Sequence, residues 1–175
     1  MRKIKQGDTA QVWCKAYTDG ACSGNPGAGG WAVMLEIWPI CIIEHGGEDE
    51  TTNNRMELLA VVKAMREFLT NERLRRACEG LEVKSDSAYV VNAVNQQWIY
   101  KWRLKNWTKD DGSSIANVDL WQEFFKLHCK FEKHNIPIRF IKVKGHAGVY
   151  GNEAVDWIAH EESQRRRKRN GKRRN

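Results

Sequence analysis

The order of strand-like and helix-like patterns constrains the fold of this chain more than any other feature. Patterns that predict strands lie at 12–19, 31–37, 40–45, 81–85 and 137–143. Segments that predict helices lie at 54–69, 87–95, 98–109, 117–131 and 151–164. Three strands in succession indicate an antiparallel meander. The full order, βββαβαααβα, predicts an α/β fold in which helices cover a mixed sheet.

Length and composition predict a single globular domain. A chain of 175 residues with 41% hydrophobic and 29% charged residues is long enough to bury a core. Its five cysteines are odd in number and lack Cys-x-x-Cys spacing, which favours reduced thiols. No run approaches the ~18 apolar residues of a membrane helix, and the N-terminus lacks the apolar segment of a secretory signal. We therefore expect a cytoplasmic monomer that does not bind membranes.

The net charge of +7 is concentrated at the C-terminus. Residues 165–175 hold eight Lys and Arg side chains and no acid, which leaves 21 basic against 22 acidic residues elsewhere. Because the positive charges of this segment repel one another, we predict that residues 165–175 form a basic disordered tail. The main domain is then expected at 12–164, after a polar leader at 1–11. The tail is interpreted as a nucleic-acid tether, with a localisation signal or a merely solvated end as alternatives.

Four carboxylates stand at predicted strand edges or helix starts, where an α/β fold gathers its functional groups. Each also has a purely structural interpretation. Asp19 ends the first predicted strand in an Asp-Gly turn pair, and Glu57 forms a variant of the capping box with Asn54. Asp86 caps a predicted helix, and Asp156 lies in early turns favoured by the helix dipole. If the four converge, they predict binding of hard cations such as Mg²⁺ and chemistry on phosphates.

Five motifs surround these acids, and their order is informative. They are Tyr17-Thr18-Asp19-Gly20, Ser23-Gly24-Asn25-Pro26-Gly27-Ala28-Gly29-Gly30, Thr51-Thr52-Asn53-Asn54-Arg55-Met56-Glu57-Leu58, Ser85-Asp86-Ser87-Ala88-Tyr89-Val90 and Val143-Lys144-Gly145-His146-Ala147-Gly148. Asp156 follows the last motif after Gly151-Asn152-Glu153. In this order and spacing, the set resembles the type 1 ribonucleases H of the bacterial single-domain kind over about residues 12–162.

The resemblance implies a fold, a reaction and a catalytic domain at 12–164. The fold is a five-stranded mixed sheet of strand order 3-2-1-4-5, flanked by helices. The reaction is endonucleolytic hydrolysis of the RNA strand of RNA/DNA hybrids, with two Mg²⁺ ions or Mn²⁺ in their place, giving 5′-phosphate and 3′-hydroxyl ends. The implied catalytic residues are the metal-binding acids and a histidine that assists proton transfer or product release: Asp19, Glu57, Asp86, Asp156 and His146.

The same resemblance suggests which residues contact the hybrid. Asn25 and Asn53 would sense the 2′-hydroxyl, and Thr52 at a helix start would hold a phosphate. Asn152 would support the active-site loop or cap the last helix. Residues 98–109 would form a basic protrusion that grips the DNA strand, with its tryptophans partly packed and its cations facing phosphate: Trp98, Lys101, Trp102, Arg103, Lys105 and Trp107. Ala88 stands where many family members have glutamine, which puts one minor-groove contact in doubt.

Two alternatives from other classes stay open on the sequence. A binding module on the same fold would have lost its chemistry, although the four intact acids argue against this. A DNA-cutting resolvase or integrase of the same superfamily would not need the Asn53-Asn54-Arg55-Met56 signature or the protrusion.

Overall fold

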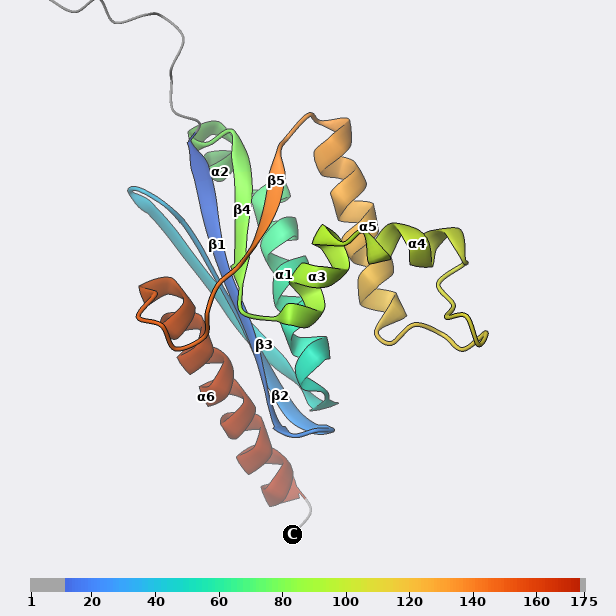
Figure 1. Ribbon diagram of the computed structural model, residues 1–175. Coiled ribbons are helices and arrows are strands. Elements are labelled where there is room, and N and C mark those ends of the chain that lie inside the picture. Colours follow the sequence, from blue (N-terminus) through green and yellow to red (C-terminus); the bar gives the residue numbers. More distant parts are fainter. Residues whose placement is uncertain (1–11, 174–175) are drawn as a thin grey trace, which may run out of the picture.

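The structure is a computed structural model that describes residues 12–173, so the predicted leader at 1–11 lies outside the described residues. Figure 1 shows the elements in space. In chain order they are β1 (Trp13–Gly24), β2 (Gly27–Ile37), β3 (Ile40–Thr51), α1 (Asn53–Thr70), α2 (Glu72–Ala77), β4 (Gly80–Ser85), α3 (Ala88–Asn95), α4 (Trp98–Leu104), α5 (Val118–Lys133), β5 (Ile138–Lys142) and α6 (Tyr150–Arg173).

The five strands form one mixed sheet in the order β3-β2-β1-β4-β5, which confirms the predicted fold. β1 pairs antiparallel with β2, and β2 pairs antiparallel with β3. β4 runs parallel to both β1 and β5. In Figure 1, α1, α3 and α5 lie on one side of the sheet and α6 lies on the other, while α4 and the loop after it project away from the body.

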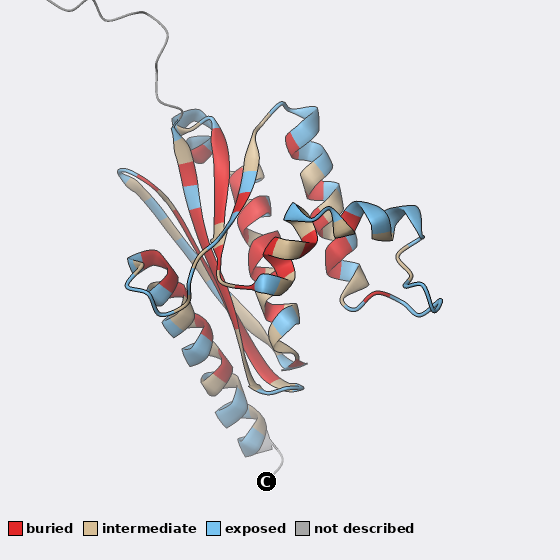
Figure 2. Cartoon of the chain, in the orientation of Figure 1, coloured by how far each residue is buried: buried red, intermediate tan, exposed pale blue. Residues whose placement is uncertain are grey.

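Two apolar clusters bury the two faces of the sheet. The larger lies under α1 and α5 and contains the stacked rings of Phe68 and Phe131, whose centroids are 5.7 Å apart. The smaller lies under α6 and joins Tyr17, Met34 and Val155. Figure 2 shows the resulting concentration of buried residues in the central strands and on the inner faces of the helices. The central strand β1 is therefore covered on both faces, which fixes its register.

The observed elements differ from the sequence patterns in several places. β1 continues to Gly24, so only Asn25 and Pro26 separate it from β2. The short helix α2 was not predicted; its six residues are too few to show an apolar stripe, and Asn71 caps it. The N-cap of α1 is Thr52 and not Asn54, because the Thr52 hydroxyl accepts a hydrogen bond from the Arg55 backbone N–H.

The prediction of a disordered tail was wrong for residues 165–173, because α6 continues to Arg173. The repulsion between neighbouring cations is offset by partners on the sheet. Arg166 and Arg169 both pair with Asp49 of β3, and the Asn170 side-chain amide donates to the Asp49 carbonyl. All five cysteines are free thiols, as predicted. Within residues 12–173, no helix has the length and apolar character needed to cross a bilayer.

Candidate active site

Asp19 lies near the middle of β1, two residues beyond the last pair between β1 and β4, Tyr17 with Lys84. The expectation that it ends the strand was wrong, because β1 continues there as the partner of β2, with Asp19 opposite Ala32. The residue is 7% exposed, and its carboxylate accepts a hydrogen bond of 2.7 Å from the Gly20 backbone N–H. Asp19 therefore projects from the central strand just where β4 turns away.

Gly20 brings α1 against β1 and so brings Glu57 to Asp19. A Cβ atom at Gly20 would lie 2.2 Å from the Glu57 backbone nitrogen, a distance that no side chain tolerates. The Glu57 carboxylate accepts a 2.8 Å hydrogen bond from the Asn53 amide and another from the Ser87 hydroxyl. It therefore connects the start of α1 with the N-cap of α3.

Asp86 follows the last residue of β4, and Ser87 is the residue that caps α3. The Ser87 hydroxyl accepts a hydrogen bond of 3.3 Å from the Val90 backbone N–H, so the Asp86 carboxylate has no capping role. The loop after β5 approaches this carboxylate closely. A Cβ atom at Gly145 would lie 2.8 Å from Oδ2 of Asp86.

His146 and Asp156 complete the group from the loop before α6 and from the helix itself. His146 has a left-handed backbone (φ 51°) and an 84% exposed side chain, and its Nδ1 lies 3.6 Å from Oδ2 of Asp156. The Glu153 carboxylate accepts a 2.9 Å hydrogen bond from the Gly148 N–H and so fastens the loop to α6.

The electrostatics link the four acids into one cluster. Burial raises the pKa of Asp19 to about 8, with further increases from the charges of Asp86, Asp156 and Glu57, against the opposing hydrogen bond from Gly20. Burial also raises the pKa of Glu57; the Ser87 hydrogen bond lowers it, and the charge of Asp86 raises it. Because repulsion between the ionised acids is a cause in both cases, a cation placed among them would relieve it.

The four acids of the cluster are suitable ligands for hard divalent cations, because each offers negatively charged carboxylate oxygens. Among residues 12–173, however, no three His, Cys, Asp or Glu side chains are gathered closely enough to hold a metal ion as they stand. The Glu57 carboxylate, for example, is engaged by Asn53 and Ser87. Among the described residues, the four acids therefore form an open cluster.

The residues expected to contact the hybrid near the cut bond meet at the start of α1. Asn25 is exposed at the β1–β2 turn, and its side-chain oxygen accepts a 3.2 Å hydrogen bond from the Asn53 backbone N–H. Thr52 precedes Asn53 as the N-cap, and Asn53 donates to Glu57. Asn152 differs, because it is 2% exposed and lies in the first turn of α6. Its burial is against direct substrate contact, and within the described residues its buried side-chain oxygen accepts no hydrogen bond, so the alternative assignment as a helix cap gains no support either.

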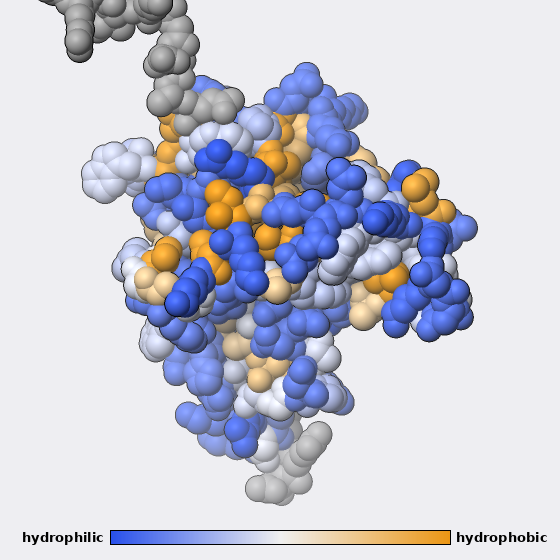
Figure 3. All heavy atoms as spheres, viewed as in Figure 1, coloured by the Kyte–Doolittle hydropathy of each residue, from blue (hydrophilic) through white to orange (hydrophobic). Residues whose placement is uncertain are grey.

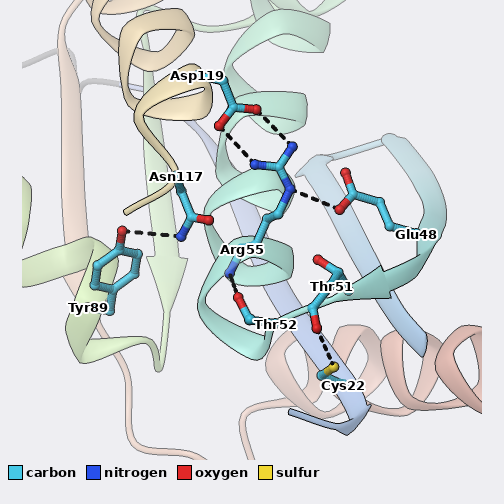
Figure 4. Close-up of polar contacts among 8 residues, drawn as sticks. All are labelled: Cys22, Glu48, Thr51, Thr52, Arg55, Tyr89, Asn117 and Asp119. Carbon is cyan, nitrogen blue, oxygen red and sulfur yellow. Dashed lines mark hydrogen bonds and ion pairs between the residues drawn. The ribbon is translucent and has the colours of Figure 1, made fainter. Parts of the chain in front are cut away.

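The sequence reasoning assigned no role to Arg55, which joins three elements (Figure 4). Its guanidinium bonds Glu48 of β3 at 2.9 Å and both carboxylate oxygens of Asp119 in α5. These hydrogen bonds raise the pKa of Arg55, and the hydrogen bonds from Arg55 lower the pKa of Asp119. Arg55 thereby fixes the start of α5, where Asn117 donates to the Tyr89 hydroxyl. The sequence motif contained Arg55, but the distance of 64 residues between Arg55 and Asp119 did not predict that the two side chains pair.

The predicted protrusion is α4 with the loop that follows it. Its tryptophans pack inward: Trp102 lies 5.3 Å from Trp121 and 6.2 Å from Trp98, and Trp107 lies 6.2 Å from Phe125, between ring centroids. The predicted cations all remain exposed, with Arg103 over the Phe125 ring and Lys105 paired with Asp110: Lys101, Arg103 and Lys105. Figure 3 shows a mainly hydrophilic surface over this projecting part.

Comparison with known proteins gives a consistent result. The model of the RNase H family matches residues 12–164. A ribonuclease H of Thermoanaerobacter sp. (strain X514) is 42% identical over 156 residues, covering 89% of this chain and 93% of the relative. One of Marinobacter nauticus is 42% identical and covers 82% of this chain and 88% of the relative.

Solved structures agree in fold. The crystal structure of LC9-RNase H1, a type 1 RNase H with the type 2 active-site motif, matches with a TM-score of 0.67 and 27% identity, covering 91% of this chain and 76% of the other. LC11-RNase H1, solved in complex with an RNA/DNA hybrid, matches with a TM-score of 0.58 and 19% identity, covering 85% and 97%. The resemblance seen in the motifs is confirmed: the chain belongs to the ribonuclease H family of endoribonucleases, as a type 1 member.

Proposed function

We propose that this protein hydrolyses the RNA strand of RNA/DNA hybrids with two divalent metal ions and leaves 5′-phosphate and 3′-hydroxyl ends. The observation that carries the proposal is the cluster of Asp19, Glu57, Asp86 and Asp156, whose burial and mutual repulsion raise the pKa of Asp19 to about 8. Such a concentration of like charge is unfavourable for folding, so its presence points to a functional requirement.

The four acids would hold the metal ions, Mg²⁺ in the first place and Mn²⁺ as a substitute, because hard cations prefer oxygen ligands. Bound there, the ions would supply an activated water and stabilise the charge of the leaving oxygen. The chain itself prepares the ligands: the Gly20 N–H holds Asp19, and the Ser87 and Asn53 side chains hold Glu57. His146 would accept or release a proton at Nδ1, the nitrogen that faces Asp156.

Substrate selection would depend on groups on both sides of this cluster. Asn25 and Asn53, which are joined by a hydrogen bond beside Glu57, would contact the 2′-hydroxyls that distinguish RNA from DNA. Thr52 at the start of α1 would hold a phosphate. On the protrusion, the exposed cations would bind the DNA strand while the tryptophans support them from within: Lys101, Arg103 and Lys105.

Cleavage of an end-labelled RNA/DNA hybrid in Mg²⁺ tests the proposal, with single-stranded RNA, duplex RNA and duplex DNA in parallel. We expect cutting of the hybrid's RNA strand alone, with products that carry a 5′-phosphate and a 3′-hydroxyl. Asp86→Asn should abolish cutting and retain binding, whereas Glu79→Gln, which changes an exposed carboxylate between α2 and β4, should cut normally. Hybrid binding without cutting in Mg²⁺ and Mn²⁺ would support a binding module, and cutting of duplex DNA a resolvase-like nuclease.

We also propose that the protein acts as a cytoplasmic monomer. All four acids and His146 come from one chain, so the cluster needs no second copy. The five free thiols agree with a reducing compartment. Light scattering after size-exclusion chromatography, and fractionation of cells that produce the protein, test the two statements. A stable dimer whose dissociation abolishes cutting would contradict the first.

A further inference from the structure

The C-terminal extension of α6, residues 165–173, is anchored on the sheet. Arg166 and Arg169 reach Asp49 at 3.4 and 2.5 Å, and Asn170 donates to its backbone carbonyl at 3.1 Å. Gly47 leaves room for this contact, since a Cβ atom there would lie 2.7 Å from Nε of Arg166. These contacts dock the end of α6 on the sheet and so set the position of its backbone at Arg167.

Arg167 lies on the same flank of α6 as the catalytic-site acid Asp156. The two are eleven residues apart, so they are separated by about three helical turns and about 16 Å along the axis, and their directions around the helix differ by only about 20°. His160 and Gln164 lie between them on this flank. Gln164 and Arg167 both contact the Ser23 hydroxyl, at 3.5 and 3.3 Å. The flank therefore runs from the acid cluster past the β1–β2 turn, as the end of α6 does in Figure 1.

The surroundings of Arg167 suit a phosphate. A hollow of about 390 Å³ lies beside it, lined by Pro26, Gly27, Asp49, Glu50, Arg167 and Asn170. Arg166 and Arg169 compensate Asp49 and lower its pKa, Arg169 more strongly than Arg166. Arg167 is the arginine in the lining of the hollow, whereas Arg166 and Arg169 lie outside that lining and neutralise Asp49, which leaves Glu50 as the other carboxylate beside Arg167. A guanidinium offers five N–H donors in a planar fork, and the Ser23 hydroxyl occupies only one side of it.

We propose that Arg167, held beside Ser23, binds a backbone phosphate of the RNA strand about three helical turns along α6 from the cleaved bond. This proposal rests on the proposed function, because the RNA strand is placed by the acid cluster and by Asn25 in the same β1–β2 turn. The extension then lengthens the part of the hybrid that the protein holds. It acts at a defined position, unlike a non-specific tether.

The test compares Arg167→Gln with Lys168→Gln, which removes the same charge from the next residue, about 100° around the helix and exposed. The KM for a long hybrid is measured against salt concentration. For Arg167→Gln we expect a three- to tenfold higher KM, an unchanged kcat and a salt slope smaller by about 0.7–0.9, as for one lost phosphate contact. Lys168→Gln should change the slope by less than half as much.

Two further arms distinguish phosphate binding from a purely structural role of Arg167. In the first, the hybrid is shortened stepwise from either end. The difference in KM between Arg167→Gln and the wild type should disappear once the phosphate beside the extension is missing. Ser23→Ala should leave the salt slope intact; if it reproduces the loss seen in Arg167→Gln, the arginine only braces the turn and the proposal is overturned. Equal effects of the two charge removals also overturn it. A wild-type protein that cuts no hybrid would instead contradict the proposed function.

Discussion

Replacing Asp19 by Asn should stabilise the metal-free protein, and increasingly so as the pH rises. The pKa of Asp19 is about 8 in the folded chain against ~3.9 in an unfolded one. The folded state therefore binds the proton more tightly, and the stability that this proton contributes is complete below pH ~4 and lost as the pH rises through 8. An amide is neutral throughout and does not lose it.

The size of the effect follows from this difference in pKa. Each pH unit between the two values removes up to ~1.4 kcal/mol from the free energy of unfolding. Between pH 5 and pH 8 the sum is about 3.6 kcal/mol for a pKa of about 8, and about 2.6 kcal/mol for a value one unit lower. Because the charges of Asp86, Asp156 and Glu57 contribute to the raised pKa of Asp19, the loss depends on the whole cluster, and Asp19→Asn measures it. We expect Asp19→Asn to gain about 2–4 kcal/mol over the wild type across this range.

Urea denaturation at pH 5 and pH 8, in EDTA and in Mg²⁺, measures this gain. Glu79→Gln is a suitable control, since it removes an exposed carboxylate just before β4, away from the cluster. Its stability difference from the wild type should stay nearly constant with pH. Mg²⁺ should stabilise the wild type more than Asp19→Asn at pH 8, because ligand binding stabilises only the folded state. If Asp19→Asn is no more stable than the wild type at pH 8 in EDTA, the electrostatic reasoning is refuted.

Three further changes have definite expected outcomes. Ser87→Ala removes the donor to Glu57 and the cap of α3, so it should cost about 1 kcal/mol in urea denaturation and lower kcat; a normal kcat would contradict the positioning role. Gly20→Ala should lower the free energy of unfolding by more than ~2 kcal/mol, since its Cβ meets the backbone of α1, whereas Gly171→Ala, with open space around it, should raise stability by up to ~1 kcal/mol. Arg55→Met should cost about 1–2 kcal/mol, less in high salt, because two partly exposed carboxylates lose their partner; equal stability at all salt concentrations would contradict this.

The fold could be predicted from the sequence for those elements whose hydrophobic residues repeat with the period of a helix or a strand. The apolar stripe of α1 and the alternation in β1 depend on which face is buried, and a single chain displays both directly. The same signals failed for α2 and for the end of α6. The stability of residues 165–173 comes from Asp49, more than a hundred positions earlier, and local composition shows only the repulsion.

The candidate site followed from motif order, while its supports did not. Asp19 and Glu57 stood in recognisable motifs, yet the reason they meet is Gly20, for which the sequence suggested no packing role against α1. Arg55 and Asp119 are 64 positions apart, and no spacing rule predicts a bidentate pair at that separation. Long-range partners of this kind arise from the fold, so they become visible only when the elements are in place.

The arrangement around Asp19 shows why this site opposes the stability of its own fold. The absence of a side chain at Gly20 lets α1 approach β1, which buries Asp19 and places Glu57 beside it. The hydrogen bonds from the Gly20 N–H and the Ser87 hydroxyl favour the charged carboxylates, but burial and mutual repulsion outweigh them, since both pKa values are raised. The chain therefore accepts a strained cluster of charge in its central strand, where apolar residues would serve folding better. Protonation of Asp19 relieves that cost below pH ~8, and in the proposed function bound divalent cations would relieve it at higher pH, so the repulsion that weakens the empty fold would strengthen metal binding.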